Sequence, residues 1–182
     1  EAAVQLHPEV NGRLSDIERV EITTHEAAVR IIDKTGPLHN PADRDHCLQY
    51  MTAVGLMSGA LTAEDYEDEQ AADPRIDRLR AKMEVKEDPA FTRNYHHPEK
   101  RAIPNTVQVF FKDGSATDAV TVAYPLGHRR RRIESIPLLR AKFRQNMKTR
   151  VSNDRVESFL TVFHNADLEA LPVNRFMALF QL

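Results

Sequence analysis

The segment Thr23-Thr24-His25-Glu26 holds the side chains near the start of the chain that are best suited to acid–base chemistry. The alternating, β-branched residues before it predict a strand, so His25 falls near the strand's end beside two hydroxyl groups. A histidine in such a place can act as a general acid or base near neutral pH. A surface histidine with one local hydrogen bond explains the same pattern. His25 is therefore the candidate catalytic residue, and a surface histidine with a structural role is the alternative.

A run of four arginines, residues 129–132, is the most pronounced local concentration of charge. It fits a phosphate-binding or nuclear-import patch. It also fits a clamp for carboxylates, because guanidinium groups bind carboxylates through two parallel hydrogen bonds. The interpretation that we favour is a solvated loop and helix entrance, partly paired with Glu134.

The histidines and the cysteine do not form a metal-binding pattern. His39 and His46 flank an expected helix start instead of lying four residues apart on one face, and His96 and His97 are adjacent, so their side chains diverge. Cys47 lies within an apolar stripe and is expected in the core. The sequence contains no HExxH, CxxC, GxSxG, Walker A or GxGxxG motif. We expect no metal held by these residues.

Composition excludes several classes of protein. With one cysteine, the 182 residues cannot form an internal disulfide framework or hold an iron–sulfur cluster by three or four local thiolates, and a reducing compartment is expected. The formal net charge is −2, with acidic and basic residues interleaved, so neither nucleic acid nor an anionic membrane is an expected partner. No apolar run reaches the roughly 20 residues of a membrane helix. Glu1 begins within a helical pattern and without a basic presequence, which predicts a piece of a longer protein.

Hydrophobic periodicity predicts an α+β fold, with a small sheet and helices in residues 15–128 and a helical tail in residues 129–182. The clearest local signal is a hairpin, in which strands 106–111 and 119–124 flank the turn residues Asp113-Gly114. Further strands are expected at 17–22 and 83–85. Residues 27–32 either continue the first strand or form an irregular segment, and residues 88–104, with three prolines, are expected to form a long surface loop.

Helices are expected where apolar residues recur at steps of three and four. The first covers residues 1–14, with Asn11-Gly12 ending its first stretch. Asn40 followed by Pro41 predicts the start of a helix that continues to Gly59, and shorter helices are expected from Thr62 and from Asp73-Pro74. In the tail, helices are expected at residues 136–147, from Asn153 onward, and at residues 173–182.

Longer strings of residues carry more specific information than single side chains do. Together they resemble the MmgE/PrpD family, and within it the branch that dehydrates 2-methylcitrate. The resemblance covers nearly the whole chain. Its motifs are residues 36–51 (GPLHNPADRDHCLQYM), 60–68 (ALTAEDYED), 87–92 (EDPAFT), 95–96 with 98–103 (YH and PEKRAI), the hairpin, 124–128 (YPLGH) and Lys142-Phe143.

The resemblance implies a two-domain enzyme with a large helical domain, a smaller α+β lid domain and a return of the chain to the helical domain. Residues 1–14 would then be the end of a connecting helix, residues 15–128 the lid and residues 129–182 the returning helices. The implied reaction is dehydration of the tricarboxylate 2-methylcitrate to 2-methyl-cis-aconitate, in the methylcitrate cycle of propionate breakdown, without cofactor or iron–sulfur cluster. The implied partners are the amino-terminal helical domain and a second copy in a homodimer. The implied location is the mitochondrial matrix in a fungus or the cytoplasm in a bacterium.

The resemblance assigns site roles to few residues of this chain, because most of the family's acid–base histidines and substrate-binding lysines belong to the amino-terminal part. The decarboxylase branch has an active-site tyrosine after the first lid strand, but residues 25–27 contain none, which leaves His25 as the polar candidate. Cys47 stands where the family commonly has serine. Arg44 and His46, near a helix amino terminus that favours anions, are candidates for holding a substrate carboxylate, or are structural residues.

Two other functions remain open at this point. A sister lyase or isomerase of the family, such as a cis-aconitate decarboxylase, shares the implied fold, although the string from Pro41 to Met51 favours the dehydratases. A binding or regulatory module could keep the fold without the chemistry. It would lack the lysine and histidine pairs of the amino-terminal part.

Overall fold

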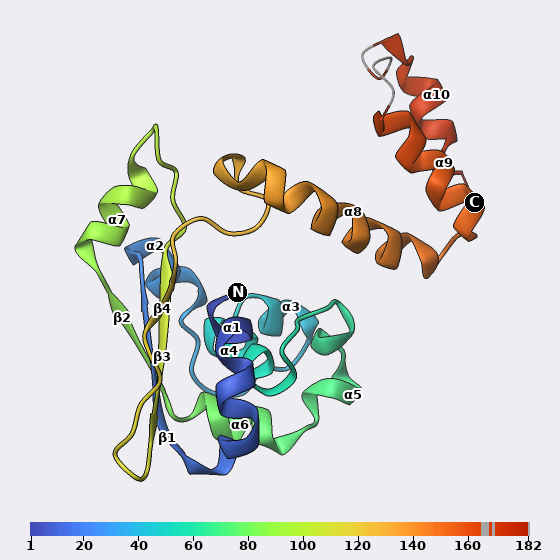
Figure 1. Ribbon diagram of the computed structural model, residues 1–182. Helices are drawn as coiled ribbons and strands as arrows, with labels where there is room; N and C mark the ends of the chain where they lie inside the picture. Colours follow the sequence, from blue (N-terminus) through green and yellow to red (C-terminus); the bar gives the residue numbers. More distant parts are fainter. Residues whose placement is uncertain (165–167, 169, 182) are drawn as a thin grey trace. The chain divides into compact units, whose positions relative to one another are not determined.

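A computed structural model describes residues 1–164, 168 and 170–181. The chain divides into two compact units, residues 1–125 and residues 126–182 (Figure 1). The core that is built on the sheet lies within the first unit.

The first unit contains a four-stranded sheet in the order β2-β1-β3-β4. The strands are β1 (Ile17–Thr24), β2 (Met83–Glu87), β3 (Asn105–Phe111) and β4 (Val120–Val122). β1 runs parallel to β2 and antiparallel to β3, and β3 is antiparallel to β4. The expected hairpin is confirmed, since Phe111 N–H donates to Ser115 O at 2.8 Å and Gly114 takes a positive φ of 84°. The predicted α+β class is also confirmed.

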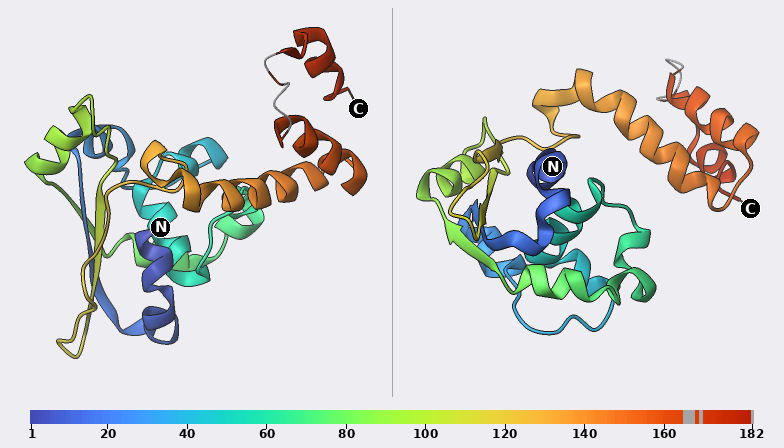
Figure 2. Two further views of the ribbon diagram at one scale, coloured as in Figure 1. Left: turned by 45° about the horizontal axis from the view of Figure 1, so that its top comes forward. Right: turned by 60° about the horizontal axis from the view of Figure 1, so that its bottom comes forward.

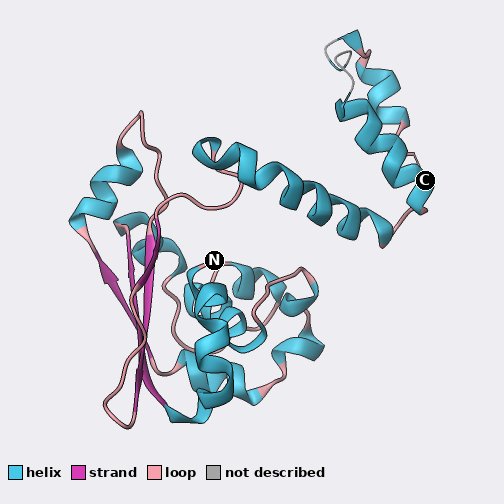
Figure 3. Ribbon diagram, viewed as in Figure 1, coloured by secondary structure: helices cyan, strands magenta, loops and turns pink. Residues whose placement is uncertain are grey.

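One face of the sheet is buried and the other is polar. Val20 and Ile22 of β1 and Val107 and Val109 of β3 point to the buried face, where helices α1 (Ala2–Val10), α4 (Leu48–Ser58) and α6 (Pro74–Arg80) lie (Figure 3). Arg19 lies on the opposite face, with its guanidinium over the Phe110 ring at 3.6 Å from the centroid. The alternation therefore places the core on a single side of the sheet.

Several predicted helix starts are confirmed. Asn40 Oδ1 accepts a hydrogen bond from Asp43 N–H at 2.9 Å and begins α3 (Pro41–Asp45), and Asp73 accepts from Arg75 N–H to begin α6. In both cases, a short polar side chain satisfies an N–H group that a helix leaves without a backbone partner. The helix expected from Thr62 is absent. Thr62 N–H donates to Asp65, the 3-10 turn η2 (Glu64–Tyr66) follows Ala63 without a side-chain cap, and the short helix α5 begins only at Asp68 and ends at Ala71.

Several expectations about the first unit are wrong. Residues 27–32 do not extend β1 but belong to helix α2 (Glu26–Ile32), because His25 caps its first turn. The expected surface loop at 88–104 contains helix α7 (Pro89–His96), which begins with the same cap-plus-proline signal at Asp88-Pro89. The single helix expected from Pro41 to Gly59 is two helices, because Cys47 is extended and buried between α3 and α4.

The amino-terminal helix is shorter than expected. α1 ends at Val10, and residues Asn11–Asp16 form the 3-10 segment η1. α1 packs closely against α4, since a Cβ atom added at Gly55 would lie 3.0 Å from the Cβ of Ala3.

The second unit is helical. It contains the 3-10 turn η3 (Arg129–Arg131) and helices α8 (Arg132–Lys148), α9 (Asn153–His164) and α10 (Val173–Ala178). Helix α8 starts before the expected Ile136, and α10 ends before the expected position 182, which lies outside the described residues. Within this unit an aromatic cluster joins α8, α9 and the end of the chain, made of Phe143, Phe159, Phe163, Phe176 and Phe180.

Candidate functional site

His25 lies at the carboxyl end of the two parallel strands. Because β1 and β2 run in the same direction, the helices that follow them, α2 and α7, begin at the same edge of the sheet and lie side by side (Figure 2). The join is held by backbone and hydroxyl groups: Asp88 N–H donates to Thr24 O at 2.9 Å, and Glu26 N–H donates to Thr92 Oγ1 at 2.9 Å. Parallel pairing therefore brings two segments that are distant in sequence together around His25.

The His25 ring is fixed by two contacts. Its Nδ1 accepts a hydrogen bond from Ala28 N–H at 3.2 Å, which caps α2. Its face stacks on the Tyr95 ring, with centroids 4.1 Å apart and an interplanar angle of 12°. Only 5% of the residue's surface is exposed. Burial lowers the pKa of His25, and the nearby His96 lowers it further, so the imidazole is neutral at physiological pH.

Tyr95 is the residue of this cluster that reasoning from single residues missed. The string Tyr95-His96 is one of the motifs that resemble the family, but residues 88–104 were expected to form a loop. The signal that could have placed Tyr95 is Asp88-Pro89, a helix start that puts residue 95 about two turns into α7.

Arg44 is buried and already paired. One terminal guanidinium nitrogen donates to Tyr66 O at 2.7 Å, and the other lies 2.7 Å from a carboxylate oxygen of Asp68. The side chain of Arg44 is 8% exposed, whereas that of Asp68 is 84% exposed. Arg44 therefore ties α3 to η2 and α5, and its ion pair reaches the surface through Asp68.

His46 is exposed and lies directly after α3. The His46 side chain is 61% exposed, and its Nδ1 pairs with the carboxylate of Asp45. The amino terminus of α3, the feature that suggested an anion site, is occupied by the Asn40 side chain. The structure thus gives Arg44 and His46 neighbours from α3, η2 and α5, whereas His25 has its contacts in α2 and α7.

A cavity of 570 Å³ lies beside the motif of residues 36–51. It is lined by Lys34, Gln49, Asp77 and Arg80, among others. Arg80 was not a candidate from sequence: it donates to Gly36 O at 2.9 Å and pairs with Asp77, and its Nε is fully buried without a partner among the described residues. These contacts hold the Gly36 loop against α6. They explain by packing alone why the motif of residues 36–51 has these residues, whether or not it also binds a ligand.

The sequence pattern of the MmgE/PrpD C-terminal domain matches residues 1–168. The chain belongs to this family. Several curated relatives support the assignment. A 2-methylcitrate dehydratase of Cupriavidus necator is 53% identical over 186 aligned residues, covering all of this chain and 38% of that protein. One from Salmonella typhimurium is 52% identical over 99% of this chain and 38% of that protein. A mitochondrial 2-methylcitrate dehydratase of Yarrowia lipolytica is 48% identical over 99% of this chain and 35% of that protein.

The match to the MmgE/PrpD C-terminal domain has a limit. The chain spans less than two-fifths of the length of these relatives.

Within the residues that the structure describes, no three His, Cys, Asp or Glu side chains are grouped so as to hold a metal ion. No described helix has the length and apolar character needed to cross a membrane.

Proposed function

We propose that this chain is the carboxy-terminal part of a hydro-lyase that converts 2-methylcitrate to 2-methyl-cis-aconitate. The observation that carries the proposal is identity of about one half, over the whole chain, to proteins named 2-methylcitrate dehydratase from two bacteria and a yeast. In this reaction a C–H bond next to a carboxylate and a C–O bond on the adjacent carbon break, a C=C bond forms, and water leaves. The groups required are a proton acceptor, a proton donor and cations that hold the carboxylates.

We assign His25 to the reacting end of the site. It is a buried imidazole held in one orientation at a sheet edge, which suits a group that must meet the substrate in a defined geometry. The reason for proposing it is the combination of fixed geometry and a titratable group, as the family's principal acid–base residues are expected in the amino-terminal part.

Arg44 and His46 are proposed as substrate-binding residues with different requirements. His46 is exposed, and its imidazolium form can meet a carboxylate directly. Arg44 reaches a substrate carboxylate only by exchanging the carboxylate of Asp68 for it. That exchange keeps a carboxylate beside the guanidinium both before and after the substrate binds.

The proposed partners are an amino-terminal helical domain of the same protein and a second copy in a homodimer. Support comes from an open hollow in the second unit that is lined by apolar side chains, among them Ile136, Leu139 and Phe163, which are 42%, 46% and 46% exposed. An exposed apolar patch of this kind marks a surface that another protein covers. We propose residues 129–182 as the segment that packs on that domain, in the mitochondrial matrix if the source is a fungus and in the cytoplasm if it is a bacterium.

The proposal is tested by assaying the protein that carries this chain, including any sequence upstream of residue 1. The protein is dialysed against a chelator and given 2-methylcitrate, and the unsaturated product is followed by ultraviolet absorbance. Turnover that survives chelation supports an iron-independent dehydratase, in agreement with the single cysteine of this chain. Turnover that disappears on chelation and returns with iron contradicts the iron-independent mechanism. No turnover by a folded protein contradicts the assignment.

A further inference from the structure

The hydrogen bond from Ala28 fixes which nitrogen of His25 carries the proton. A neutral imidazole has one N–H donor and one acceptor nitrogen. Nδ1 accepts from Ala28 N–H at 3.2 Å, so its lone pair is occupied and the ring hydrogen must be on Nε2. In this arrangement Nδ1 cannot collect a proton from a substrate, because the helix backbone already uses that lone pair.

Tyr95 determines how the ring is turned. The face-to-face stack, with centroids 4.1 Å apart, leaves the imidazole little freedom to rotate about its side-chain bonds. Tyr95 is itself anchored, because the end of α7 is tied down by neighbouring bonds: Ala102 N–H donates to Asn94 O at 3.2 Å, and Lys100 Nζ donates to Asn94 Oδ1 at 2.7 Å. The Ala28 bond and the Tyr95 stack therefore come from α2 and α7, the two helices that meet at this sheet edge.

Nε2 is the free end of the ring. Among the described residues, the His25 ring makes its hydrogen bond through Nδ1. The one fully buried side-chain nitrogen or oxygen without a partner in the described chain is Arg80 Nε, so Nε2 of His25 keeps a small contact with solvent, within the 5% of the residue that is exposed. An N–H group that is fixed in direction, accessible and without a protein acceptor is suited to bind an oxygen from outside the chain.

We infer that His25 presents Nε2–H as a hydrogen-bond donor to a carboxylate oxygen of the substrate, and that Tyr95 is the positioning residue that holds it there. The inference rests on the proposed function for the identity of the substrate. In the dehydration, negative charge grows on the carboxylate next to the carbon that loses its proton. A fixed N–H donor stabilises that charge without giving up its hydrogen. His25 is therefore an oxyanion donor and not the general base.

Burial is the larger cause of the lowered pKa of His25, and the charge of His96 is the second cause. Both favour the neutral ring. The charged and titratable groups on the elements around His25 are Glu26 and Arg30 on α2, Lys86, Glu87 and Asp88 at the end of β2, and Arg93 and His96 on α7.

The tautomer can be measured without any enzyme assay. We would label histidine with ¹⁵N in the 182-residue chain, record the ring nitrogens by long-range ¹H–¹⁵N NMR, and assign His25 from its absence in His25→Asn. Asparagine is a good helix cap, so this variant keeps the bond to Ala28. We expect a single neutral tautomer with the hydrogen on Nε2 between about pH 7 and 8. A hydrogen on Nδ1, or an average of both tautomers, overturns the inference.

Tyr95 is tested with a matched pair of variants. Tyr95→Phe keeps the stacked ring and removes only the hydroxyl, whereas Tyr95→Leu removes the stack. We expect the phenylalanine variant to match the wild-type His25 spectrum and the leucine variant to show mixed tautomers and a pKa closer to the ordinary value. Equal spectra for all three proteins would remove Tyr95 from the positioning role.

Activity separates the inference from the proposed function. In the protein with its upstream sequence, we expect kcat to fall about 10²-fold in His25→Asn, as for loss of an oxyanion donor, with KM little changed. Tyr95→Leu should lower kcat by a smaller factor, and Tyr95→Phe should not lower it. If wild type is inactive on 2-methylcitrate, the proposed function fails while the NMR result stands. If wild type is active and His25→Asn retains its kcat, the inference fails alone.

Discussion

At the scale of single residues, the sequence identifies His25 correctly as a strand-end residue but not what fixes it. The position follows from the strand pattern of residues 17–22, which is local. The stack joins His25 to Tyr95, 70 positions away, and depends on the parallel pairing of β1 with β2, which no local pattern of residues indicates. The burial of Arg44 is equally non-local, because its partners lie in η2 and α5.

The lowered pKa of His25 predicts a pH-dependent stability. An unfolded chain binds a proton at this residue near its ordinary pKa of 6.5, whereas the folded chain binds it only at lower pH. Stability from this group is therefore complete above that value and is lost as the pH falls below it. We expect the Tm of wild type to fall more steeply than that of His25→Asn between about pH 7 and pH 5. Parallel curves in calorimetry would show that His25 titrates normally.

Arg44 gives a second prediction at this scale. Arg44→Ala leaves Tyr66 O without its donor and removes a buried, charge-assisted hydrogen bond, so we expect the free energy of unfolding to fall by about 2 kcal/mol. Asp68→Ala serves as the control and should cost about 0.5 kcal/mol, because its carboxylate is mostly exposed. Urea denaturation of both variants measures the difference. Equal losses would mean that the ion pair, rather than the bond to Tyr66, carries the stability.

At the scale of elements, the sequence predicts correctly those turns and helix starts that a few neighbouring residues determine. The Asp-Gly hairpin and the cap-plus-proline starts of α3 and α6 follow from a few neighbouring residues and are confirmed. Helix α7 carries the same signal at Asp88-Pro89, but the prolines around it favoured a loop. Helix α2 was missed because its β-branched residues fit a strand equally well. The cap that decides between them is a histidine, which is not among the common capping residues.

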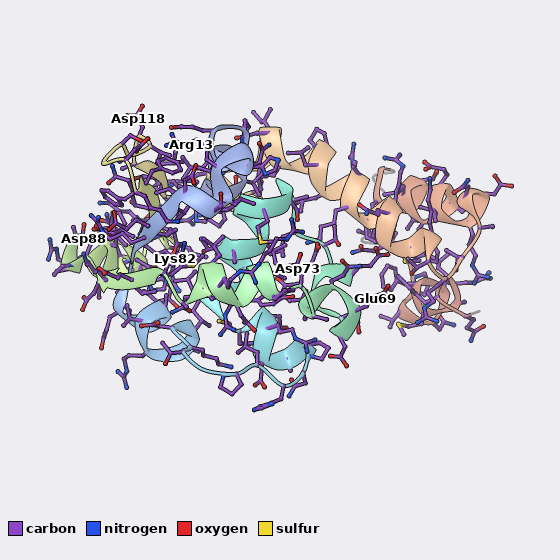
Figure 4. All side chains as sticks on the ribbon, turned by 90° about the horizontal axis from the view of Figure 1, so that it is seen from below. Arg13, Glu69, Asp73, Lys82, Asp88 and Asp118 are labelled. Carbon is purple, nitrogen blue, oxygen red and sulfur yellow. The ribbon has the colours of Figure 1, made fainter. Side chains whose placement is uncertain are left out.

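The cap of α7 should affect His25 through Tyr95. Asp88 and Asp73, which cap α7 and α6, are both labelled in Figure 4, and each accepts a hydrogen bond from a backbone N–H of its helix. We expect Asp88→Ala and Asp73→Ala each to lower the free energy of unfolding by about 1 kcal/mol. Only Asp88→Ala should also disturb the His25 ring signals. The same disturbance in Asp73→Ala would show that general loosening, and not α7, moves the ring.

Gly59, at the end of α4, allows the His7 ring of α1 to approach closely, because glycine has no side chain. Its φ is +68°, and a Cβ atom there would lie 2.7 Å from Cδ2 of His7 in α1. That ring cannot move aside freely, because its Nδ1 is bonded to Leu56 O at 2.9 Å. We expect Gly59→Ala to cost about 2 kcal/mol or more, and Gly36→Ala, which has the strain but open space, about 1 kcal/mol. Equal costs by denaturation would show that the His7 contact is unimportant.

At the scale of the whole molecule, the two units differ in how far they bury their own apolar side chains. The main core lies within residues 1–125, whereas the second unit exposes Ile133, Val173 and Met177. We therefore expect residues 1–125 alone to stay folded, with unchanged His25 signals and less self-association than the 182-residue chain. Light scattering and binding of a hydrophobic dye measure the second point. If the truncated chain associates as strongly as the longer one, the surface responsible for self-association lies in the first unit.

The activity that we propose for the whole protein is the dehydration of 2-methylcitrate. We would give the protein, with its upstream sequence, an equal mixture of 2-methylcitrate and cis-aconitate after chelation and follow both by ¹H NMR. This measurement distinguishes loss of water from loss of CO₂ in one sample. We expect 2-methyl-cis-aconitate to appear while cis-aconitate undergoes at most slow hydration. Loss of CO₂ from cis-aconitate, with 2-methylcitrate unchanged, would contradict the account and move the protein to the decarboxylase branch.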